Sequence, residues 1–200
     1  MKKFLTAILL SCAMVLCSCQ SAKNVEETRK ITLPVSYMVF STGKAENSDE
    51  YLESVEETVE VIKALGPEYI TDVTVLDGSL VLEVTEKQRD KLIEWNNEKM
   101  AEWVDPLLKA DPLYSFTGSE DYTEATFYYD EKCSVIVALK AIGAASGGYA
   151  FNNILINNTT DWNVHLRIYN CHTNRIVVDV NIPEEQAVLN DEVWAASYEE

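Results

Sequence analysis

A tight-turn signal in the first half of the chain predicts a β-hairpin. Asp77-Gly78 separates two apolar segments rich in β-branched residues, 69–76 and 79–85. An Asp-Gly pair between two such segments favours the turn whose twist matches a pair of antiparallel strands. We therefore expect two antiparallel strands here, and the rest of the fold has to accommodate them.

Helix-like segments flank this hairpin. Apolar residues recur at helical spacing over residues 48–65, and a Gly-Pro pair then provides a stop signal. The sequence Thr85-Glu-Lys-Gln88 is typical of a capping box and predicts a second helix that ends near residue 108. A strand is expected before both helices, at residues 31–41.

The second half of the chain repeats this order. We expect a strand at residues 124–130 and a long apolar helix at 133–156. A second hairpin is expected from residues 162–169 and 175–182. The sequence that begins at Pro183 would then open a short final helix or tail.

The predicted class is therefore α+β, with an antiparallel or mixed sheet and helices packed on it in βαββα-βαββ order. We assign residues 31–200 to a single domain of this class. Two arrangements agree equally well with the order of elements. One is a duplicated βαββ unit, and the other is an extended ferredoxin-like core.

The N-terminus has a different character from the rest of the chain. Two lysines follow Met1, and an apolar run then occupies residues 4–16. A helix of this length spans about 20 Å, which is less than the roughly 30 Å of a bilayer core. The pattern is typical of an export signal, so residues 1–18 are interpreted as a signal peptide outside the folded domain.

The sequence Leu-Cys-Ser-Cys that ends at Cys19 resembles the lipobox of bacterial lipoproteins. The resemblance implies cleavage before Cys19, diacylation of Cys19 and attachment of the mature N-terminus to a membrane. Residues 19–30 would then form a polar, lipidated tether. The folded domain would lie outside the cytoplasm, on the outer face of the cell membrane or on the outer membrane. In a host with two membranes, Gln20 in place of an aspartate would favour the outer one.

The charge balance excludes several kinds of partner. The chain has 16 basic and 33 acidic residues and a formal net charge of −17. Such a chain repels phosphate backbones and anionic headgroups, so we expect no nucleic-acid binding and no electrostatic docking on a membrane. Apolar residues make up 47% of the sequence, which excludes a disordered chain.

Two cysteines, Cys133 and Cys171, follow Cys19 in the chain. If strands 124–130 and 162–169 are parallel and joined by a right-handed crossover, both cysteines lie at the same edge of the sheet. An extracytoplasmic location permits a disulfide between them. Two unpaired thiols in reducing surroundings are the alternative.

A metal site could be assembled from His165, Cys171 and His172, with Cys133 as a fourth ligand. Zinc binds such donors, but their spacing matches no common zinc motif. We therefore expect no metal and no cofactor. The same residues can be explained without a metal. His165 would be a surface histidine on a strand, and Cys171 and His172 would belong to a turn.

Asn96 lies inside the apolar arc of the second helix, among Leu92, Met100 and Val104. A buried amide must form hydrogen bonds, so Asn96 should either bond to backbone or line a pocket. Alternation along the strand at 124–130 places Tyr128 on the opposite face from its two aromatic neighbours.

The sequence contains no phosphate-binding loop and no Gly-x-Ser-x-Gly motif, and paired acids are too common here to indicate catalysis. We therefore expect a protein that is not an enzyme: a binding or envelope-assembly module, attached through Cys19, whose partner could be another envelope protein. The alternative is a secreted hydrolase or glycan-binding protein that uses acids near the aromatic-rich residues 114–169.

Overall fold

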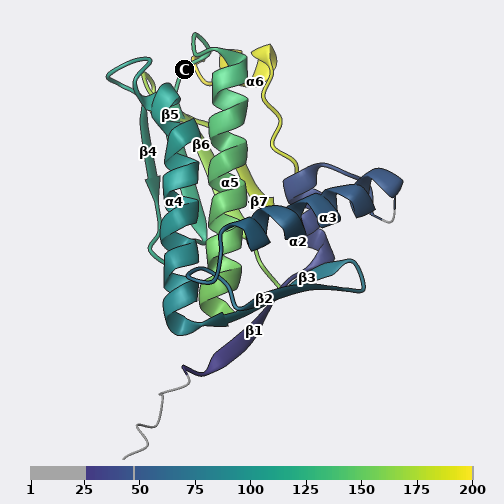
Figure 1. Cartoon of the computed structure of the whole chain (residues 1–200). Coiled ribbons are helices and arrows are strands. Elements are labelled where there is room, and N and C mark those ends of the chain that lie inside the picture. The colour runs from purple at the N-terminus through teal and green to yellow at the C-terminus, as the bar shows by residue number, and fades with distance from the viewer. Residues whose placement is uncertain (1–25, 47, 200) are drawn as a thin grey trace, which may run out of the picture.

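The computed structural model describes residues 26–46 and 48–199. The predicted α+β class and order of elements are confirmed (Figure 1). The signal peptide and Cys19 lie outside the described residues. The elements are β1 (Thr28–Leu33), α2 (Val35–Thr42), α3 (Asp49–Ala64), β2 (Asp72–Leu76), β3 (Ser79–Thr85), α4 (Glu86–Leu108), β4 (Ser115–Gly118), β5 (Glu124–Tyr129), α5 (Val135–Asn157), β6 (Val164–Asn170), β7 (Ile176–Ile182) and α6 (Asp191–Ala196).

The strands form two sheets. The first has the order β1-β3-β2 and is antiparallel throughout. The second has the order β4-β5-β6-β7, and β5 and β6 are its parallel pair. In Figure 1 the long helices α4 and α5 stand side by side against the second sheet, and the first sheet lies across their lower ends beneath α3.

The two βαββ segments do not share one topology. In the first, β1 pairs antiparallel with β3, the second strand of its hairpin. In the second, β5 pairs parallel with β6, the first strand of its hairpin. The chain is therefore not a duplicated unit, and because its strands form two sheets it does not contain one ferredoxin-like sheet either.

Helix α5 is the core of the fold. It packs against α4, against β5 and β6, and also against β1 and α2. Among the described helices, α5 is the one that is long and apolar enough to cross a membrane, but most of that apolar stretch is buried by the rest of the domain. A helix that is apolar all round and packed on several sides is typical of a protein core. Its Gly148 permits close approach to α4, since a Cβ there would lie 3.3 Å from the Met100 sulfur.

The expected strand at residues 31–41 is wrong beyond Leu33. Pro34 ends β1 and becomes the N-cap of α2, and the Pro34 carbonyl accepts a hydrogen bond from the Met38 amide at 3.0 Å. Proline has no N–H to donate to a sheet, and its restricted φ suits the start of a helix. The aromatic and β-branched residues that follow therefore pack on α5 as a helix.

The sequence that begins at Pro183 does not open the last helix. Helix α6 begins at Asp191, where the Asn190 side chain accepts a hydrogen bond from the Val193 amide at 3.0 Å. Residues 183–190, which we call the C-terminal segment, have no regular helix or strand. In Figure 1 this segment descends beside α5 as a yellow coil from α6 to β7.

Candidate functional site

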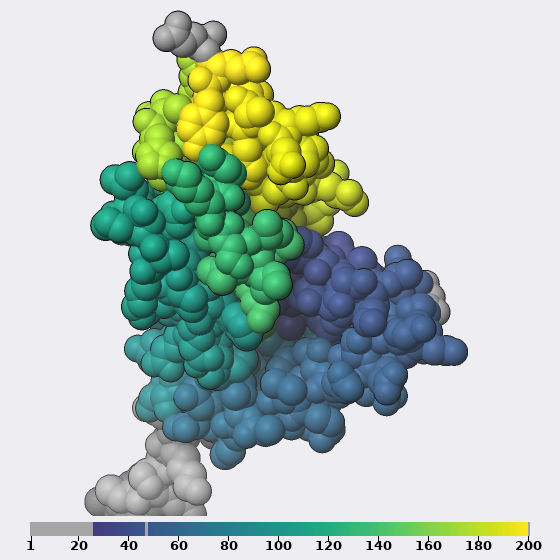
Figure 2. All heavy atoms as spheres, turned by 90° about the horizontal axis from the view of Figure 1, so that it is seen from above, coloured from purple at the N-terminus to yellow at the C-terminus, as the bar shows by residue number. Residues whose placement is uncertain are grey.

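A groove lies between the first half of α5 and the C-terminal segment. Its cavity has a volume of about 540 Å³. Helix α2 contributes Phe40, and Figure 2 shows the yellow C-terminal region, the green start of α5 and the purple α2 meeting on this face of the molecule. The apolar side chains that line it are Val39, Phe40, Leu139, Ile142, Leu166, Ile182, Pro183 and Ala187.

One buried polar group in the lining of this groove has no partner. The Ser146 side chain belongs to α5, and the residue is only 1% exposed. Among the described residues, the Ser146 Oγ is the one buried side-chain oxygen or nitrogen without a hydrogen bond. Burying a hydroxyl without a partner costs about 1–3 kcal/mol. A ligand in the groove that hydrogen-bonds to Ser146 would remove this cost.

A second, smaller hollow continues the groove along α5. It has a volume of about 140 Å³ and shares Leu139 with the groove. It is lined by Val135 and Leu139 of α5, by Trp194 of α6, and by Asp130 and Cys133. The exposed fractions of Val135 and Leu139 are 69% and 55%, which is high for large apolar side chains. The apolar surface of α5 is thus open from α2 to the end of β5.

Asp130 is the centre of a polar cluster at the end of β5. Its carboxylate accepts hydrogen bonds from the Tyr114 hydroxyl and from the Lys132 amide at 3.0 Å, and it lies 2.8 Å from the His172 Nε2. Burial raises the pKa of Asp130, but the hydrogen bonds from Tyr114 and His172 outweigh this effect and lower it overall. A carboxyl with a lowered pKa stays ionised, which is the opposite of what a general acid requires.

Both cysteines lie beside Asp130. The Cys133 amide donates to the Asp130 carbonyl at 3.1 Å, and the Cys171 amide donates to the Tyr129 carbonyl at 3.1 Å. Both are free thiols, and burial followed by the charge of Asp130 raises the pKa of each. The disulfide between them stays a prediction. A raised pKa reduces the thiolate fraction, so neither thiol resembles an activated nucleophile.

The histidines considered for a metal site lie apart. His172 is in the turn after β6, beside Asp130 and Cys171. His165 is near the other end of β6, where it pairs with Asp179 and lies 2.9 Å from the Arg167 guanidinium. Asp130 was not among the candidate ligands predicted from the sequence. The signal that could have identified Asp130 is the expected parallel pairing of β5 and β6, because this pairing brings the carboxyl ends of both strands to one edge of the sheet.

The hydrogen bonding predicted for Asn96 is confirmed. Its amide donates to the Gly148 carbonyl and to the Asn152 Oδ1, each at 2.9 Å. Asn152 in turn donates to the Asn97 Oδ1 at 2.8 Å, and Asn97 donates to the Tyr122 hydroxyl at 3.0 Å. This network joins α4 to α5, and Asn96 also lines a hollow between these two helices.

The aromatic side chains of β5 follow the predicted alternation. Phe127 and Tyr129 are buried, at 0% and 2% exposed, whereas Tyr128 is half-buried on the other face. The Tyr128 ring stacks on that of Tyr169, with 5.0 Å between the ring centroids and 12° between the planes. Two of these three rings therefore belong to the core.

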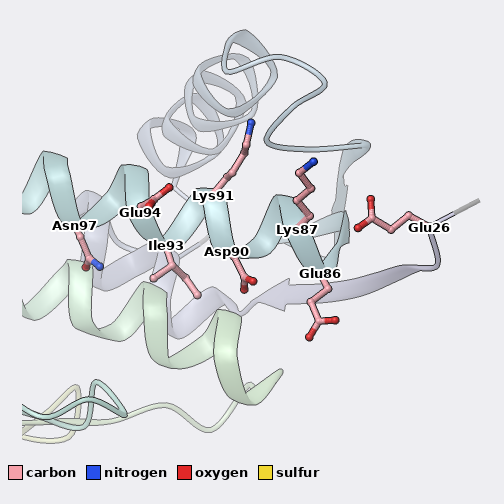
Figure 3. Close-up of a pocket in the computed structure, with 8 residues that line it drawn as sticks. All are labelled: Glu26, Glu86, Lys87, Asp90, Lys91, Ile93, Glu94 and Asn97. Atoms are coloured by element: carbon pink, nitrogen blue, oxygen red, sulfur yellow. The ribbon is translucent and has the colours of Figure 1, made fainter.

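A further hollow, near the start of α4, is lined by charged side chains (Figure 3). Its volume is also about 540 Å³. In Figure 3, Lys87 and Lys91 point to one side of α4 while Glu86 and Asp90 point to the other, so their charges do not converge. Lys91 is engaged with Glu68 at 2.8 Å. We assign no function to this surface.

Comparison of the chain with protein-family models, curated proteins and solved structures found no match to any of them.

Proposed function

We propose that this protein is a lipid-anchored, extracytoplasmic binding protein, attached to a membrane through acyl chains on Cys19. Its ligand is an uncharged, largely apolar molecule with one hydrogen-bonding group, held in the groove between α5 and the C-terminal segment. The observation that carries this proposal is the unpartnered, buried hydroxyl of Ser146 in the lining of a largely apolar groove.

The lining of the groove supports an apolar ligand. Ligand sites are typically concave and apolar, with a few polar groups that fix the orientation of the ligand. Here most of the lining is aliphatic and aromatic side chains, Ser36, Glu185 and Gln186 are exposed polar residues of the lining, and Ser146 is its buried polar group. Glu185 lies at the rim, where its carboxylate accepts a hydrogen bond from the Asn181 amide at 2.7 Å.

The charge of the chain supports an uncharged ligand. The net charge is −17, and Glu185 adds a carboxylate next to the apolar walls. An anionic ligand would be repelled both at long range and at the rim. A neutral molecule loses little by leaving water, and it gains from burial about 25 cal/mol for each Å² of its apolar surface.

The test is binding of the neutral fluorescent probe N-phenyl-1-naphthylamine, whose amine can donate to the Ser146 Oγ. The chain from residue 19 onward, carrying Cys19→Ser, is used because it needs no detergent. Gly143→Leu should lower the affinity at least tenfold. Gly143 lines the groove, and a Cβ at this position would meet nothing within 4 Å, so the leucine side chain is free to occupy the groove.

Glu98→Leu, an exposed position on α4, is the matched control and should bind the probe like the parent chain. Gly143→Leu should fold at least as well as the parent, because leucine is the better helix former by about 0.8 kcal/mol. Equal probe binding in the parent chain and in folded Gly143→Leu would contradict the proposal.

A further inference from the structure

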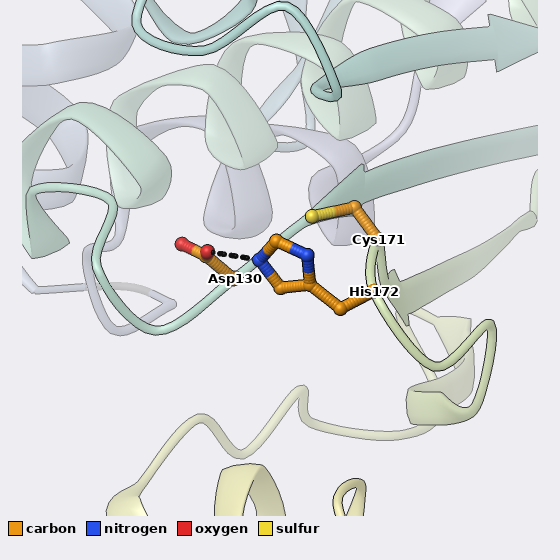
Figure 4. Close-up of side chains that lie close together, drawn as sticks. All are labelled: Asp130, Cys171 and His172. Atoms are coloured by element: carbon orange, nitrogen blue, oxygen red, sulfur yellow. Dashed lines mark hydrogen bonds and ion pairs between the residues drawn. The ribbon is translucent and has the colours of Figure 1, made fainter.

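Three metal-ligating side chains converge at the carboxyl ends of β5 and β6. One ligand atom each from Asp130, Cys171 and His172 lie within 4.8 Å of one another (Figure 4). Asp130 directly follows β5, whereas Cys171 and His172 follow β6. In Figure 4, the imidazole lies between the Asp130 carboxylate and the backbone of the turn, and the Cys171 sulfur points toward the same space.

The surrounding hydrogen bonds hold Asp130 in position. The Tyr114 hydroxyl and the Lys132 amide both donate to its Oδ1. Its Oδ2 faces the His172 Nε2 at 2.8 Å. One oxygen is thus fixed by neighbouring groups while the other faces the remaining two ligands. Such outer hydrogen bonds orient the carboxylate ligands of metal sites.

The exposure of the cluster allows an ion to enter. Asp130 is 4% exposed and Cys171 is partly buried, but the His172 side chain is 40% exposed. The charge environment also favours a cation, because the buried carboxylate of Asp130 lies beside the thiol of Cys171. An imidazole, a thiolate and a carboxylate together are typical ligands of zinc.

We propose that Asp130, Cys171 and His172 bind one divalent metal ion of the zinc type, with solvent in the fourth position. On binding, the Cys171 thiol releases its proton to solvent as the metal–sulfur bond forms, and the proton that a neutral His172 imidazole holds between its Nε2 and the Asp130 Oδ2 moves to the Nδ1, which frees the Nε2 for the ion. One proton is therefore released per ion. A disulfide between Cys171 and Cys133 excludes the ion, so binding requires the reduced protein. The site does not depend on the function of the groove.

The test is titration of the reduced Cys19→Ser chain with Co²⁺ alone, followed by displacement with Zn²⁺. We expect one Co²⁺ per chain, a thiolate-to-cobalt charge-transfer band and loss of this band when Zn²⁺ is added. The apparent affinity should fall about tenfold for each pH unit below the thiol pKa, because one proton is released. Cys171→Ser should abolish the band, and His172→Gln should weaken binding at least tenfold.

His165→Gln is the matched control, because this histidine also pairs with an aspartate but does not belong to the cluster of Asp130, Cys171 and His172. It should bind Co²⁺ within twofold of the parent chain. His172→Gln should fold normally, because His172 lies in an exposed turn. Absence of the band in the reduced parent chain would overturn the proposal. Equal binding by folded His172→Gln and by the parent would also overturn it.

Discussion

Replacing Cys19 by serine should abolish lipid attachment completely. Cys19 is the cysteine of the lipobox-like sequence, and serine has no thiol to receive the acyl-bearing group. Each buried methylene contributes about 0.8 kcal/mol to membrane binding, so two acyl chains anchor a protein stably where one does not. The measurement is metabolic labelling with palmitate. Membrane fractionation is carried out in parallel on Cys19→Ser chains that lack residues 1–18. These chains should appear in the soluble fraction.

Cys17→Ser is the matched control, because Cys17 lies two residues upstream and would be removed with the signal peptide. It should keep both the label and the membrane attachment. Retention of the acyl label by Cys19→Ser would show that another residue carries the lipid, and the proposed anchor would then be wrong.

Replacing Asp130 by alanine should destabilise the folded domain by about 3 kcal/mol at pH 7. The change removes a buried carboxylate and leaves the Tyr114 hydroxyl and the Lys132 amide without their acceptor. Hydrogen bonds to charged groups contribute about 1.5–3 kcal/mol each, and an unsatisfied buried group adds a further cost. The free energy of unfolding, measured by urea denaturation, tests this prediction.

The same carboxylate should also contribute to loss of stability in acid. The folded-state pKa of Asp130 is lowered, whereas the unfolded value is about 3.9. A lowered folded pKa stabilises the protein fully above pH 4, and this contribution is lost as the pH falls through the folded value. Asp130→Ala should therefore lose less stability than the parent chain between pH 5 and pH 2.

Asp179→Ala is the control for both measurements, since Asp179 pairs with the other histidine, His165, on an exposed surface. It should change the stability by about 0.5 kcal/mol or less. Equal effects of Asp130→Ala and Asp179→Ala would mean that the cluster around Asp130 contributes little to the fold.

Local chemistry in the sequence was sufficient to predict the structure where a turn or a helix cap determines the backbone conformation. Asp77 and Gly78 both have positive φ, at 49° and 77°, as the predicted two-residue hairpin requires. The Thr85 hydroxyl accepts from the Gln88 amide at 3.2 Å, and the Gln88 side chain accepts from the Thr85 amide at 2.8 Å, which forms the predicted capping box. These signals act within a few residues, so they do not depend on the rest of the fold.

Local chemistry was insufficient to predict the structure where packing between distant segments determines it. Residues Val35–Thr42 have the β-branched and aromatic composition of a strand, yet they form α2 because Pro34 starts a helix that packs on α5 and α3. The division into two sheets also depends on long-range pairing, since β1 reaches across to β3. No periodicity within a single segment indicates which strands will pair.

The candidate sites depend on the same long-range contacts. Ser146 lies in a stretch of alanine and glycine that predicts close packing, and only the folded chain places its hydroxyl in a groove without a partner. Asp130 is one of 33 acidic residues, and only its position beside the turn after β6 distinguishes it from the others. Cys171 and His172 were candidates from the sequence, but the carboxylate of Asp130, which lies next to them in the fold, was not.

The most direct test of the proposed binding function is Ser146→Ala, measured for both stability and probe affinity. Ser197→Ala is its matched control: Ser197 is also buried, but its hydroxyl donates to the Trp194 carbonyl at 2.6 Å and accepts from Asn170 at 2.8 Å. We predict that Ser146→Ala stabilises the fold by about 1 kcal/mol and weakens N-phenyl-1-naphthylamine binding about fivefold, whereas Ser197→Ala destabilises the fold by a similar amount. A loss of stability in Ser146→Ala with unchanged probe affinity would contradict the account.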